Sequence, residues 1–484
     1  MILTNTIAAP ATVPGTGAIS IIRVSGEDAL SIADKVVSFK HGTASESAGY
    51  TLKYGSVEGI DDVLVSIFRA PHSYTGEDSV EISCHASAYI VSQILQRLMD
   101  AGAVPAEPGE FTRRAFVNGR MDLAQAEAVA DVIASGNEAS HRVAMHQLKG
   151  GISAELQLLR EQLLDVTSLM ELELDFSEED VEFADRHRLD NLLASTLAHI
   201  DRLTSSFRLG NAIRTGVPVA IVGATNTGKS TLLNALLGEE RAIVSDIAGT
   251  TRDTVEEVFN IDGTDFRLID TAGIRDTFDE IESKGIDRTY QKLLLADVVV
   301  HVLDVNSPVG TVSSAVSNIV SKMDLAHQKY IVVLNKADKA VSALELAKIE
   351  ASEGTFEGSL EVNKIVTIIN NIVNLPDYQQ DIIVMSAKYS LAVDRLKILL
   401  SETQKARIAD SGTAALVTNA RHYNALCSAS RALTLARSGL ASHTPTDLVS
   451  QDLREALYHL GAITGAITTD EVLGNIFKKF CIGK

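Results

Sequence analysis

One short motif limits the fold of this chain more than any other feature. Residues 219–230 have the sequence VAIVGATNTGKS, in which an apolar run precedes Gly223, Gly228, Lys229 and Ser230 at the spacing G-x-x-x-x-G-K-[ST]. The glycines let successive backbone N–H groups face an anion, and a helix N-terminus behind the loop adds partial positive charge. The motif therefore predicts a buried parallel strand, a phosphate-binding loop and a helix that begins at TLLNALLG.

Length and composition limit the remaining possibilities. At 484 residues the chain is too long for one core, and roughly 150 residues per domain suggests about three domains. The formal net charge of −20 argues against coating of nucleic acid through bulk charge, although a local basic patch stays possible. Three widely separated cysteines, no leader pattern and no long apolar run predict a reduced, cytoplasmic protein without a membrane span.

Residues 1–118 have the mixed pattern of an α+β domain. Strands are expected at 18–24 and 63–68, and helices at 28–37 and 88–101. Two polar stretches, at 70–85 and 108–122, are dense in charged and turn-forming residues. They are either surface loops of no special role or part of a site.

Long helices follow this first part. Asp122 is a suitable N-cap for a helix over 123–148, a Gly-Gly pair at 150–151 interrupts the pattern, and further helices are expected at 152–176 and about 186–208. From about residue 390 the chain returns to helices until its end. The two helical segments, 119–215 and 390–484, are expected to pack together.

The middle of the chain alternates strands and helices, which is typical of a doubly wound parallel sheet. A hairpin is expected around Asp262-Gly263, and buried strands are expected in VVVHVLDV, YIVVLN and DIIVMSA. We therefore expect an inserted α/β domain over 216–389. The segment 342–381 is expected to add a surface helix.

Four more motifs follow the phosphate loop in the order that a GTPase requires. A GTTRD turn at 249–253 and a DTAG motif at 270–273 have the residues that approach Mg²⁺ and a γ-phosphate. The Asp of NKAD at 335–338 can accept hydrogen bonds from guanine N1–H and the 2-amino group, and SAK at 386–388 closes the base site. From these motifs the expected nucleotide-binding residues are Asn226, Thr227, Gly228, Lys229, Ser230, Thr231, Thr250, Thr251, Asp270, Thr271, Ala272, Gly273, Asn335, Lys336, Asp338, Ser386, Ala387 and Lys388, with Ser230 and Thr251 as Mg²⁺ ligands.

The catalytic water needs a partner that the usual position does not supply. Ile274 stands where Ras-type GTPases place a Gln directly after DTAG. Either hydrolysis is slow or another segment positions the water. Glu282 is the candidate for that role, and simple surface charge is the alternative. No arginine finger is evident, so a monovalent cation beside the phosphates, bound in part by the Asn226 carbonyl, can neutralise charge instead.

Nearly the whole chain resembles the MnmE (TrmE) family of bacterial GTPases that modify the wobble uridine of certain tRNAs. The resemblance lies in SYTGED at 73–78, PGEFTRRAFVNGRMDLAQAEAV at 108–129, GTTRD at 249–253 and the terminal FCIGK at 480–484. It implies a homodimer formed through the N-terminal domains and GTP hydrolysis stimulated by K⁺ and by dimerisation of the GTPase domains. It also implies a flavin-dependent partner of the MnmG (GidA) type in a heterotetramer. By the same resemblance Glu282 orients the attacking water, and K⁺ is bound by Asn226, Ser245, Ile247 and Thr250.

The resemblance also implies a folate site in the N-terminal domain for a one-carbon tetrahydrofolate derivative. Arg23, Glu81, Arg120 and Lys484 occupy the positions expected to hold it. A carboxylate suits the amide-like donors of a pterin, and Arg or Lys suits a glutamate tail. The alternative for Arg23 is a surface charge at a strand end.

Cys481 is the remaining candidate catalytic residue. Nearby lysines favour the reactive thiolate, and the resemblance assigns this position to the modification chemistry. The sequence leaves open whether the thiol acts as a nucleophile, a redox group or a proton-transfer group.

Three functions are compatible with these motifs. The first is a tRNA-modifying GTPase that cycles to control folate and tRNA sites. The second is a ribosome-assembly or signalling GTPase, in which the PGEFTRRAF stretch and the Cys-containing tail have no purpose. The third is a GTP-regulated folate transferase whose substrate is not RNA. The first is favoured because it alone uses all parts of the chain.

Overall fold

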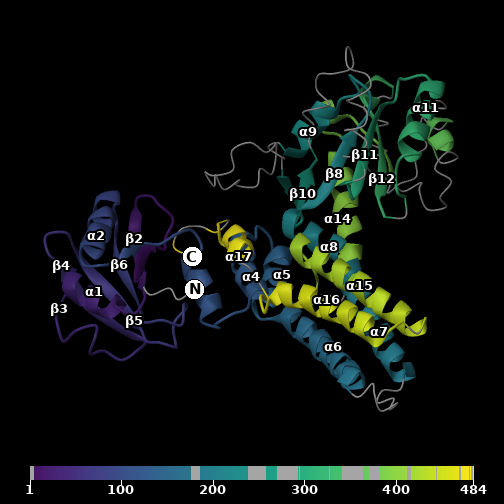
Figure 1. The fold of residues 1–484 in the computed structure, drawn as a ribbon. Coiled ribbons are helices and arrows are strands. Elements are labelled where there is room, and N and C mark those ends of the chain that lie inside the picture. Colours follow the sequence, from purple (N-terminus) through teal and green to yellow (C-terminus); the bar gives the residue numbers. More distant parts are fainter. Residues whose placement is uncertain are drawn as a thin grey trace. The chain divides into compact units, whose positions relative to one another are not determined.

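The computed structural model (Figure 1) describes residues 5–175, 186–237, 258–269, 293, 295–325, 327–340, 364–369, 381–410, 416–442, 444–467, 470–478, 480 and 483. The chain forms two compact units. One consists of Met1–Ala134, Ala144–Thr204 and Arg421–Lys484, and the other of Ser135–Val143 and Ser205–Ala420. The second unit is thus inserted in the sequence of the first. The finer division into four parts at 118, 215 and 389 stays a prediction.

The first unit contains a seven-stranded sheet with the order β3-β4-β5-β6-β2-β1-β7. Its pairs are antiparallel except for the parallel pair β1–β7. The strands are β1 (Ile7–Pro10), β2 (Gly17–Ser25), β3 (Ser38–Phe39), β4 (Thr51–Val57), β5 (Asp61–Phe68), β6 (Ser79–Ala86) and β7 (Val104–Pro105).

Two helices cover one face of this sheet. Alternating side chains such as Ile22, Ile67 and Ile82 point into a core with Ile32 of α1 (Ala29–Val36) and Leu98 of α2 (Ala88–Asp100). This confirms the expected strands at 18–24 and 63–68 and both expected helices. The opposite face carries exposed Leu52, Tyr54 and Leu64, of which the last two are cross-strand partners.

The two polar stretches are not simple surface loops. The second half of 70–85 forms β6, a central strand between β5 and β2. The stretch 108–122 forms α3 (Glu110–Val117) and the turn that follows it. Several of their polar residues, such as Ser73, Glu110 and Arg114, are buried in the folded domain, where each needs a partner.

The rest of the first unit is helical. Its helices are α4 (Leu123–Ala134), α6 (Gly151–Asp175), α7 (Arg186–Ser205), α15 (Ala420–Ala441), α16 (Thr446–Thr464) and α17 (Asp470–Phe477). In Figure 1, α6 and α16 run side by side, and they pack against each other. The Asp122 cap is confirmed, since Asp122 Oδ1 accepts a bond of 2.8 Å from Gln125 N, and Gln125 Oε1 accepts one of 3.0 Å from Asp122 N.

Two expected helix boundaries were wrong. The helix expected over 123–148 is divided into α4 and α5 (Glu138–Leu148), because Asn137 caps a new helix after Gly136. The helix expected over about 186–208 is likewise divided into α7 and α8 (Phe207–Thr215).

The second unit contains a six-stranded sheet with the order β13-β12-β11-β8-β10-β9. All of its pairs are parallel except β9–β10, so the expected doubly wound sheet is confirmed. The elements are β8 (Val217–Val222), α9 (Lys229–Leu237), β9 (Val258–Ile261), β10 (Thr264–Leu268), β11 (Val298–Asp304), α11 (Val309–Val320), β12 (Lys329–Asn335), β13 (Ile382–Val384) and α14 (Val393–Asp410).

Both faces of this sheet are covered. Val219 and Ile221 of β8 belong to one core, whereas Ala220 and Val222 belong to the core on the other face. All six residues of β8 are buried, as expected for the central strand of a parallel sheet. The expected hairpin is also confirmed, with positive φ at both Asp262 and Gly263 in its turn. Within the expected extra segment 342–381, residues 364–369 are helical.

Among the residues that the structure describes, no helix has both the length and the apolar character that a bilayer crossing requires.

Candidate functional site

The phosphate loop follows β8 directly and ends where α9 begins. Gly223 has a φ of +148°, and a Cβ there would lie 2.2 Å from the carbonyl oxygen of Val302 in the neighbouring strand. Gly228 has a φ of +99°. Only glycine adopts both conformations without strain at such close approach. Asn226, the expected K⁺ ligand in this loop, is exposed and has a left-handed φ of 60°.

Lys229 lies over its own loop. Its Nζ donates hydrogen bonds to the carbonyl oxygens of Gly223 at 2.8 Å and Ala224 at 2.7 Å. Burial of the ammonium lowers the pKa of Lys229. Ser230 and Thr231 are exposed on the first turn of α9, next to this charge. The arrangement concentrates donors and positive charge at the carboxyl end of β8, where open α/β sheets bind ligands.

Asn335 joins the phosphate loop to two distant motifs. Its Nδ2 donates to the carbonyl oxygen of Thr227 at 2.8 Å, and its Oδ1 accepts a bond of 3.0 Å from Ala387 N. Asn335 is buried at the end of β12, and a Cβ on Gly228 would lie 2.2 Å from its Nδ2. One amide side chain therefore fixes the spacing between the phosphate loop and the segment 386–388.

Asp338, the aspartate of the NKAD motif, is oriented by Ser386 of the SAK motif. Ser386 Oγ donates to Asp338 Oδ1 at 2.6 Å, which fixes the carboxylate at the rim formed by β12 and β13. A fixed carboxylate can accept two donors in one plane, the pattern that guanine presents and adenine lacks. The expected base-site residues thus lie together.

Asp304 belongs to the same site and was not identified from the sequence. Its carboxylate forms an ion pair of 2.8 Å with Lys336 Nζ, and the pair holds Lys336 in its left-handed conformation beside the loop. Burial raises the pKa of Asp304, but hydrogen bonds from Lys336 and Asn306 outweigh burial and lower it. Asp304 lies opposite Asn335 in the β11–β12 register, a pairing that only the fold reveals.

A second set of expected residues comes together in the first unit. Arg23 and Glu81 are cross-strand partners on β2 and β6, and Glu81 Oε1 accepts bonds from Arg23 Nε at 2.9 Å and Nη2 at 2.8 Å. The guanidinium lies 5.2 Å from the Tyr74 ring centroid and 5.6 Å from that of Phe111. Arg23 is therefore paired and flanked by aromatic rings, and the surface-charge alternative does not describe it.

Arg120 and the chain terminus approach the same region. The side-chain carbons of Arg120 pack beside Gly76, in the loop between β5 and β6 that also contains Tyr74. Arg23 Nη1 donates to the carbonyl oxygen of Gly483 at 3.5 Å. Gly483 has a φ of +92°, and a Cβ there would lie 2.1 Å from the carbonyl oxygen of Pro10. The described part of the tail thus contacts the N-terminal sheet.

Arg114 explains the polar stretches and was also not identified as important from the sequence. Its side chain is 1% exposed and pairs with Glu77 at 3.2 Å and with Glu110 at 2.9 Å. Its Nη1 and Nη2 also donate to the backbone and side-chain oxygens of Asn5 at 2.8 Å. A buried charge is tolerated only with such partners, so polar residues of the two stretches are explained by their contacts with each other through Arg114.

Several expected site residues lie outside the described part of the chain. These are Ser245, Ile247, Thr250, Thr251, Asp270, Thr271, Ala272, Gly273, Glu282, Cys481 and Lys484. Their roles stay predictions from the sequence.

Comparisons with known proteins agree with the motifs over the full length. Residues 6–120 match the profile described as "GTP-binding protein TrmE N-terminus", and residues 123–481 match the one described as "MnmE helical domain". A Bacteroides thetaiotaomicron protein named "tRNA modification GTPase MnmE" is 48% identical, with 99% of each chain covered. A Flavobacterium johnsoniae protein of the same name is 46% identical, with 100% of each chain covered.

Two solved structures resemble part of the chain more distantly. A GTP-binding protein from Sulfolobus solfataricus in complex with GDP has 18% identity and a TM-score of 0.28, with 51% of this chain and 67% of that one covered. The G domain of the T. maritima FeoB iron transporter has 20% identity and a TM-score of 0.25, with 38% and 97% covered. The full-length relatives and the two profiles, by contrast, span the described fold from its first strand to its last helix. This chain therefore belongs to the MnmE family of tRNA modification GTPases.

Proposed function

We propose that this protein hydrolyses GTP and uses the cycle to add an aminomethyl-type group, such as carboxymethylaminomethyl, to carbon 5 of the wobble uridine of certain tRNAs. Its full-length relatives bear the name of a tRNA modification GTPase, which supports tRNA as the substrate. The observation that carries the proposal is the bridge made by Asn335 between Thr227 and Ala387, together with the Ser386–Asp338 bond. These contacts preform a guanine site beside a phosphate loop.

Guanine selection follows from the cost of mispairing. An adenine ring in this site lacks the 2-amino donor and leaves the oriented Asp338 carboxylate without a partner. An unpaired charged group costs more than an unpaired neutral one, so GTP is favoured over ATP by roughly 100-fold or more.

The residues around the loop suit the proposed cations. The Ser230 hydroxyl lies on the exposed first turn of α9, where a hard divalent cation finds an oxygen ligand, and Thr251 is the second proposed Mg²⁺ ligand. Asn226 offers a neutral amide oxygen, and Ser245, Ile247 and Thr250 complete the proposed K⁺ shell. These cations supply charge neutralisation at the phosphates. Glu282 orients the attacking water in place of the Gln that Ile274 replaces.

The Arg23–Glu81 pair of the N-terminal domain is proposed to belong to a site for a one-carbon tetrahydrofolate derivative. The aromatic rings of Tyr74 and Phe111 and the carboxylate of Glu81 suit a flat ring with amide-like donors. Arg23, Arg120 and Lys484 offer cations to a carboxylate-bearing tail. Cys481, which is close to Lys484 in the sequence, is proposed to take part in the modification chemistry.

Two kinds of protein partner are proposed. A homodimer through the N-terminal domains would cover the sheet face that carries exposed Leu52, Tyr54 and Leu64. GTPase-domain dimerisation activates hydrolysis, and a flavoprotein of the MnmG (GidA) type completes a heterotetramer in the cytoplasm.

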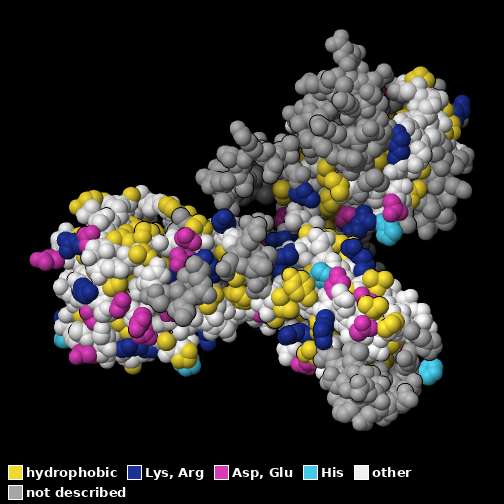
Figure 2. Space-filling view, in the orientation of Figure 1, with side chains coloured by type: hydrophobic (Ala, Val, Ile, Leu, Met, Phe, Trp, Pro, Cys, Tyr) yellow, Lys and Arg dark blue, Asp and Glu magenta, His cyan; other side chains and the backbone are white. Residues whose placement is uncertain are grey.

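On the face shown in Figure 2, the described Lys and Arg side chains lie among acidic and hydrophobic ones. The net charge of −20 favours recognition of tRNA by local contacts over bulk attraction.

The cation and water roles are tested by hydrolysis of GTP by the whole chain in K⁺ and in Na⁺, with wild type and Glu282→Ala. We expect K⁺ to raise kcat at least tenfold over Na⁺, and Glu282→Ala to remove most of the K⁺-stimulated rate without a large change in KM. Equal rates in both salts, or a fully active Glu282→Ala variant, would contradict the proposed mechanism.

A further inference from the structure

The hairpin β9–β10 is contacted by three segments of the second unit. In chain order these segments are 135–143, helix α8, which follows the return of the chain to the second unit at 205, and helix α14, which precedes the end of that unit at 420. Helix α8 packs on β8 and β10, and α14 packs on β9. Ser401 of α14 also donates a bond of 3.0 Å to Asp262 in the hairpin turn. The hairpin is thus held from several sides by the connecting segments.

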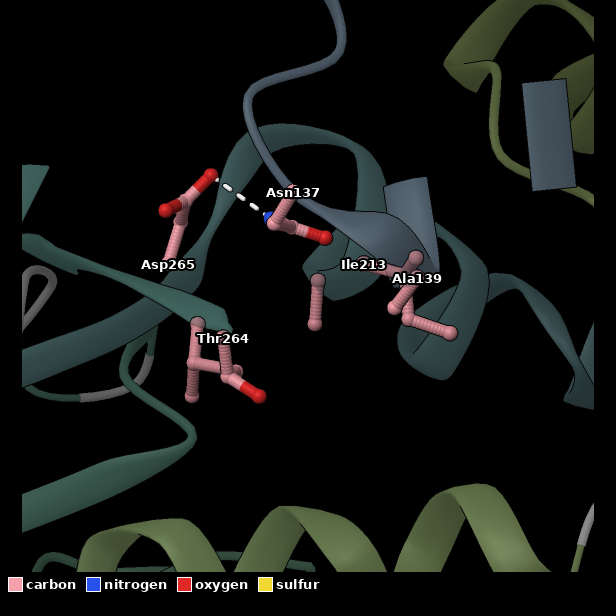
Figure 3. Close-up of a pocket in the computed structure, with 7 residues that line it drawn as sticks. Asn137, Ala139, Ile213, Thr264 and Asp265 are labelled. Carbon is pink, nitrogen blue, oxygen red and sulfur yellow. Dashed lines mark hydrogen bonds between the residues drawn. The ribbon is translucent and has the colours of Figure 1, made fainter. Parts of the chain in front are cut away.

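Asn137 makes two contacts at once, of which Figure 3 draws the one with Asp265. Its Nδ2 donates to Asp265 Oδ2 on β10 at 2.7 Å, and its Oδ1 accepts a bond of 2.8 Å from Ser140 N in the first turn of α5. Asn137 N also donates to Ser140 Oγ at 3.3 Å. The same side chain therefore caps α5 and fastens it to the sheet. Helix α5 then continues past Val143 to Leu148, into the sequence of the other unit.

Each carboxylate oxygen of Asp265 accepts a hydrogen bond from one side-chain amide. Its Oδ1 accepts a bond of 2.6 Å from Asn260 Nδ2 on β9, and its Oδ2 accepts the bond from Asn137. A cavity of about 10 Å³ lies beside this pair, which is room for one water at most. It is too small for a ligand, so the junction is a packed contact. The cavity is lined by Asn137, Ala139, Ala212, Ile213, Val217, Thr264 and Asp265.

In the sequence, the hairpin connects the GTTRD motif to the DTAG motif. Strand β9 begins at Val258, shortly after GTTRD at 249–253, and β10 ends at Leu268, directly before DTAG at 270–273. Phe259 and Phe266 are paired across the strands, stacked at 5.5 Å and almost fully buried. The paired strands and the stacked, buried rings stabilise the hairpin as one element.

We propose that Asn137 and Asp265 are positioning residues that couple the nucleotide state of the GTPase domain to α5, and through α5 to the helical unit. The inference rests on the proposed GTP cycle and names the contact by which that cycle reaches the rest of the chain. Displacement of the hairpin moves Asp265, and the bond to Asn137 transfers the displacement to the cap of α5. Loss of the bond leaves the second unit folded and releases the cap of α5 from the hairpin.

The contact can be broken and rebuilt without loss of the cap. Asn137→Ser keeps an N-cap oxygen but is too short to reach Asp265. Asn137→Asp also keeps the cap and places two carboxylates against each other. The double variant Asn137→Asp/Asp265→Asn exchanges donor and acceptor, so the bond across the junction and the bond from Asn260 can both form. Asn260→Ser is the matched control, because it removes the other bond to the same carboxylate without touching α5.

Hydrogen–deuterium exchange of the whole chain measures the coupling directly. In each variant, exchange of the amides in 135–148 is compared between GDP and a non-hydrolysable GTP analogue. We expect at least a threefold difference between the two nucleotides in wild type and in Asn260→Ser. The difference should fall below 1.5-fold in Asn137→Ser and Asn137→Asp and return in the double variant.

The outcomes separate failure of the inference from failure of the proposed function. Nucleotide binding is followed in the same samples with a fluorescent GDP. If nucleotide binds but wild type shows no difference at 135–148, or the single variants keep it, or the double variant does not regain it, the inference is wrong. If no guanine nucleotide binds, the proposed function fails first and the inference fails with it.

Discussion

Gly228 and Asn335 determine whether the nucleotide site can form at all. Their backbone and amide atoms approach so closely that no side chain fits at position 228. The same amide holds Thr227 and Ala387, so one residue of the loop controls contacts with two other motifs. A substitution here is expected to damage binding far more than folding.

Gly228→Ala should lower GTP affinity at least about 100-fold. The new Cβ would lie 2.2 Å from Asn335 Nδ2 and would sit on a backbone with a φ of +99°, so Asn335 must move and its two bonds are lost. Titration with a fluorescent GTP analogue measures the loss. Gly310→Ala in α11 is the matched control, since a Cβ there meets nothing within 4 Å and should leave affinity unchanged. Equal affinities in the two variants would refute the steric argument.

Asp338→Asn should exchange guanine for xanthine specificity. The amide keeps an oxygen for Ser386 but loses the charge that accepts the guanine donors, which is worth about 3 kcal/mol, or roughly 100-fold in KM for GTP. Xanthine presents an oxygen where guanine presents its amino group, so the new amide can donate to it. Competition between GTP and xanthosine triphosphate in a hydrolysis assay decides the point. An unchanged KM for GTP would show that Asp338 does not contact the base.

The sequence predicted the site residues that belong to motifs of fixed spacing and missed the charged residues that hold other charged residues in place. Lys229, Asn335 and Asp338 are evident because a phosphate and a guanine demand those residue types in that order. Asp304 and Arg114 are evident only in the fold, because their partners come from distant segments. A charge whose role is to hold another charge carries no local pattern.

The junction of α4, α15 and α16 shows how elements of the first unit are joined. Glu127 of α4 accepts bonds of 2.9 Å from Arg421 Nε and 2.7 Å from His422 Nε2, both on α15. Arg421 also donates to the carbonyl oxygens of Ala462 and Ile463 near the end of α16. Burial would raise the pKa of Glu127, but the bonds from His422 and Arg421 outweigh it and lower the pKa to about 2.

Acid should weaken this junction in a defined window. A carboxyl whose pKa falls from 4.5 to about 2 on folding stabilises the fold above pH 4.5, and this stabilisation is lost as the pH falls toward 2. The shift corresponds to about 3 kcal/mol. Glu127→Gln should remove a comparable amount at pH 7 and flatten the loss below pH 4.5. Hydrogen exchange of α4 and α15 between pH 7 and pH 3 measures both effects, and an unchanged acid profile in the variant would contradict them.

Elements were predicted best where their pattern is long and regular. The buried strands of the GTPase domain and the Asp122 cap were evident, because periodicity and capping are local properties. The break between α4 and α5 was missed because Asn137 continues an apparently helical pattern, and its second bond, to Asp265, lies far away in the sequence. Strand β6 was hidden by its polar outward face.

The whole molecule has an acid-sensitive group in each compact unit. In the second unit His301 donates or accepts a bond of 2.8 Å with Tyr330 Oη. Burial and the charge of Lys229 lower the pKa of His301 from 6.5 to about 4. Because the unfolded chain takes up the proton first, the second unit loses about 3 kcal/mol as the pH falls from 6.5 to 4, whereas the Glu127 window lies below 4.5.

The second unit should therefore soften before the first on acidification. Hydrogen exchange of β11 and α4 in one titration distinguishes the two units, and β11 should lose protection at the higher pH. His301→Gln, which keeps a partner for Tyr330, should remove most of the change between pH 6.5 and 4 in β11 and leave α4 unaffected. Simultaneous loss of protection in both elements would argue against separate windows.

The central claim is that GTP hydrolysis in the inserted unit serves tRNA modification. The most direct test is mass spectrometry of tRNA nucleosides from a bacterial strain that lacks its own gene of this family and expresses either this chain or its Lys229→Ala variant. We predict that the chain restores the modified wobble uridine and that Lys229→Ala, without its phosphate-binding ammonium, does not. Full restoration by Lys229→Ala, or no restoration by a chain that hydrolyses GTP normally, would contradict the account.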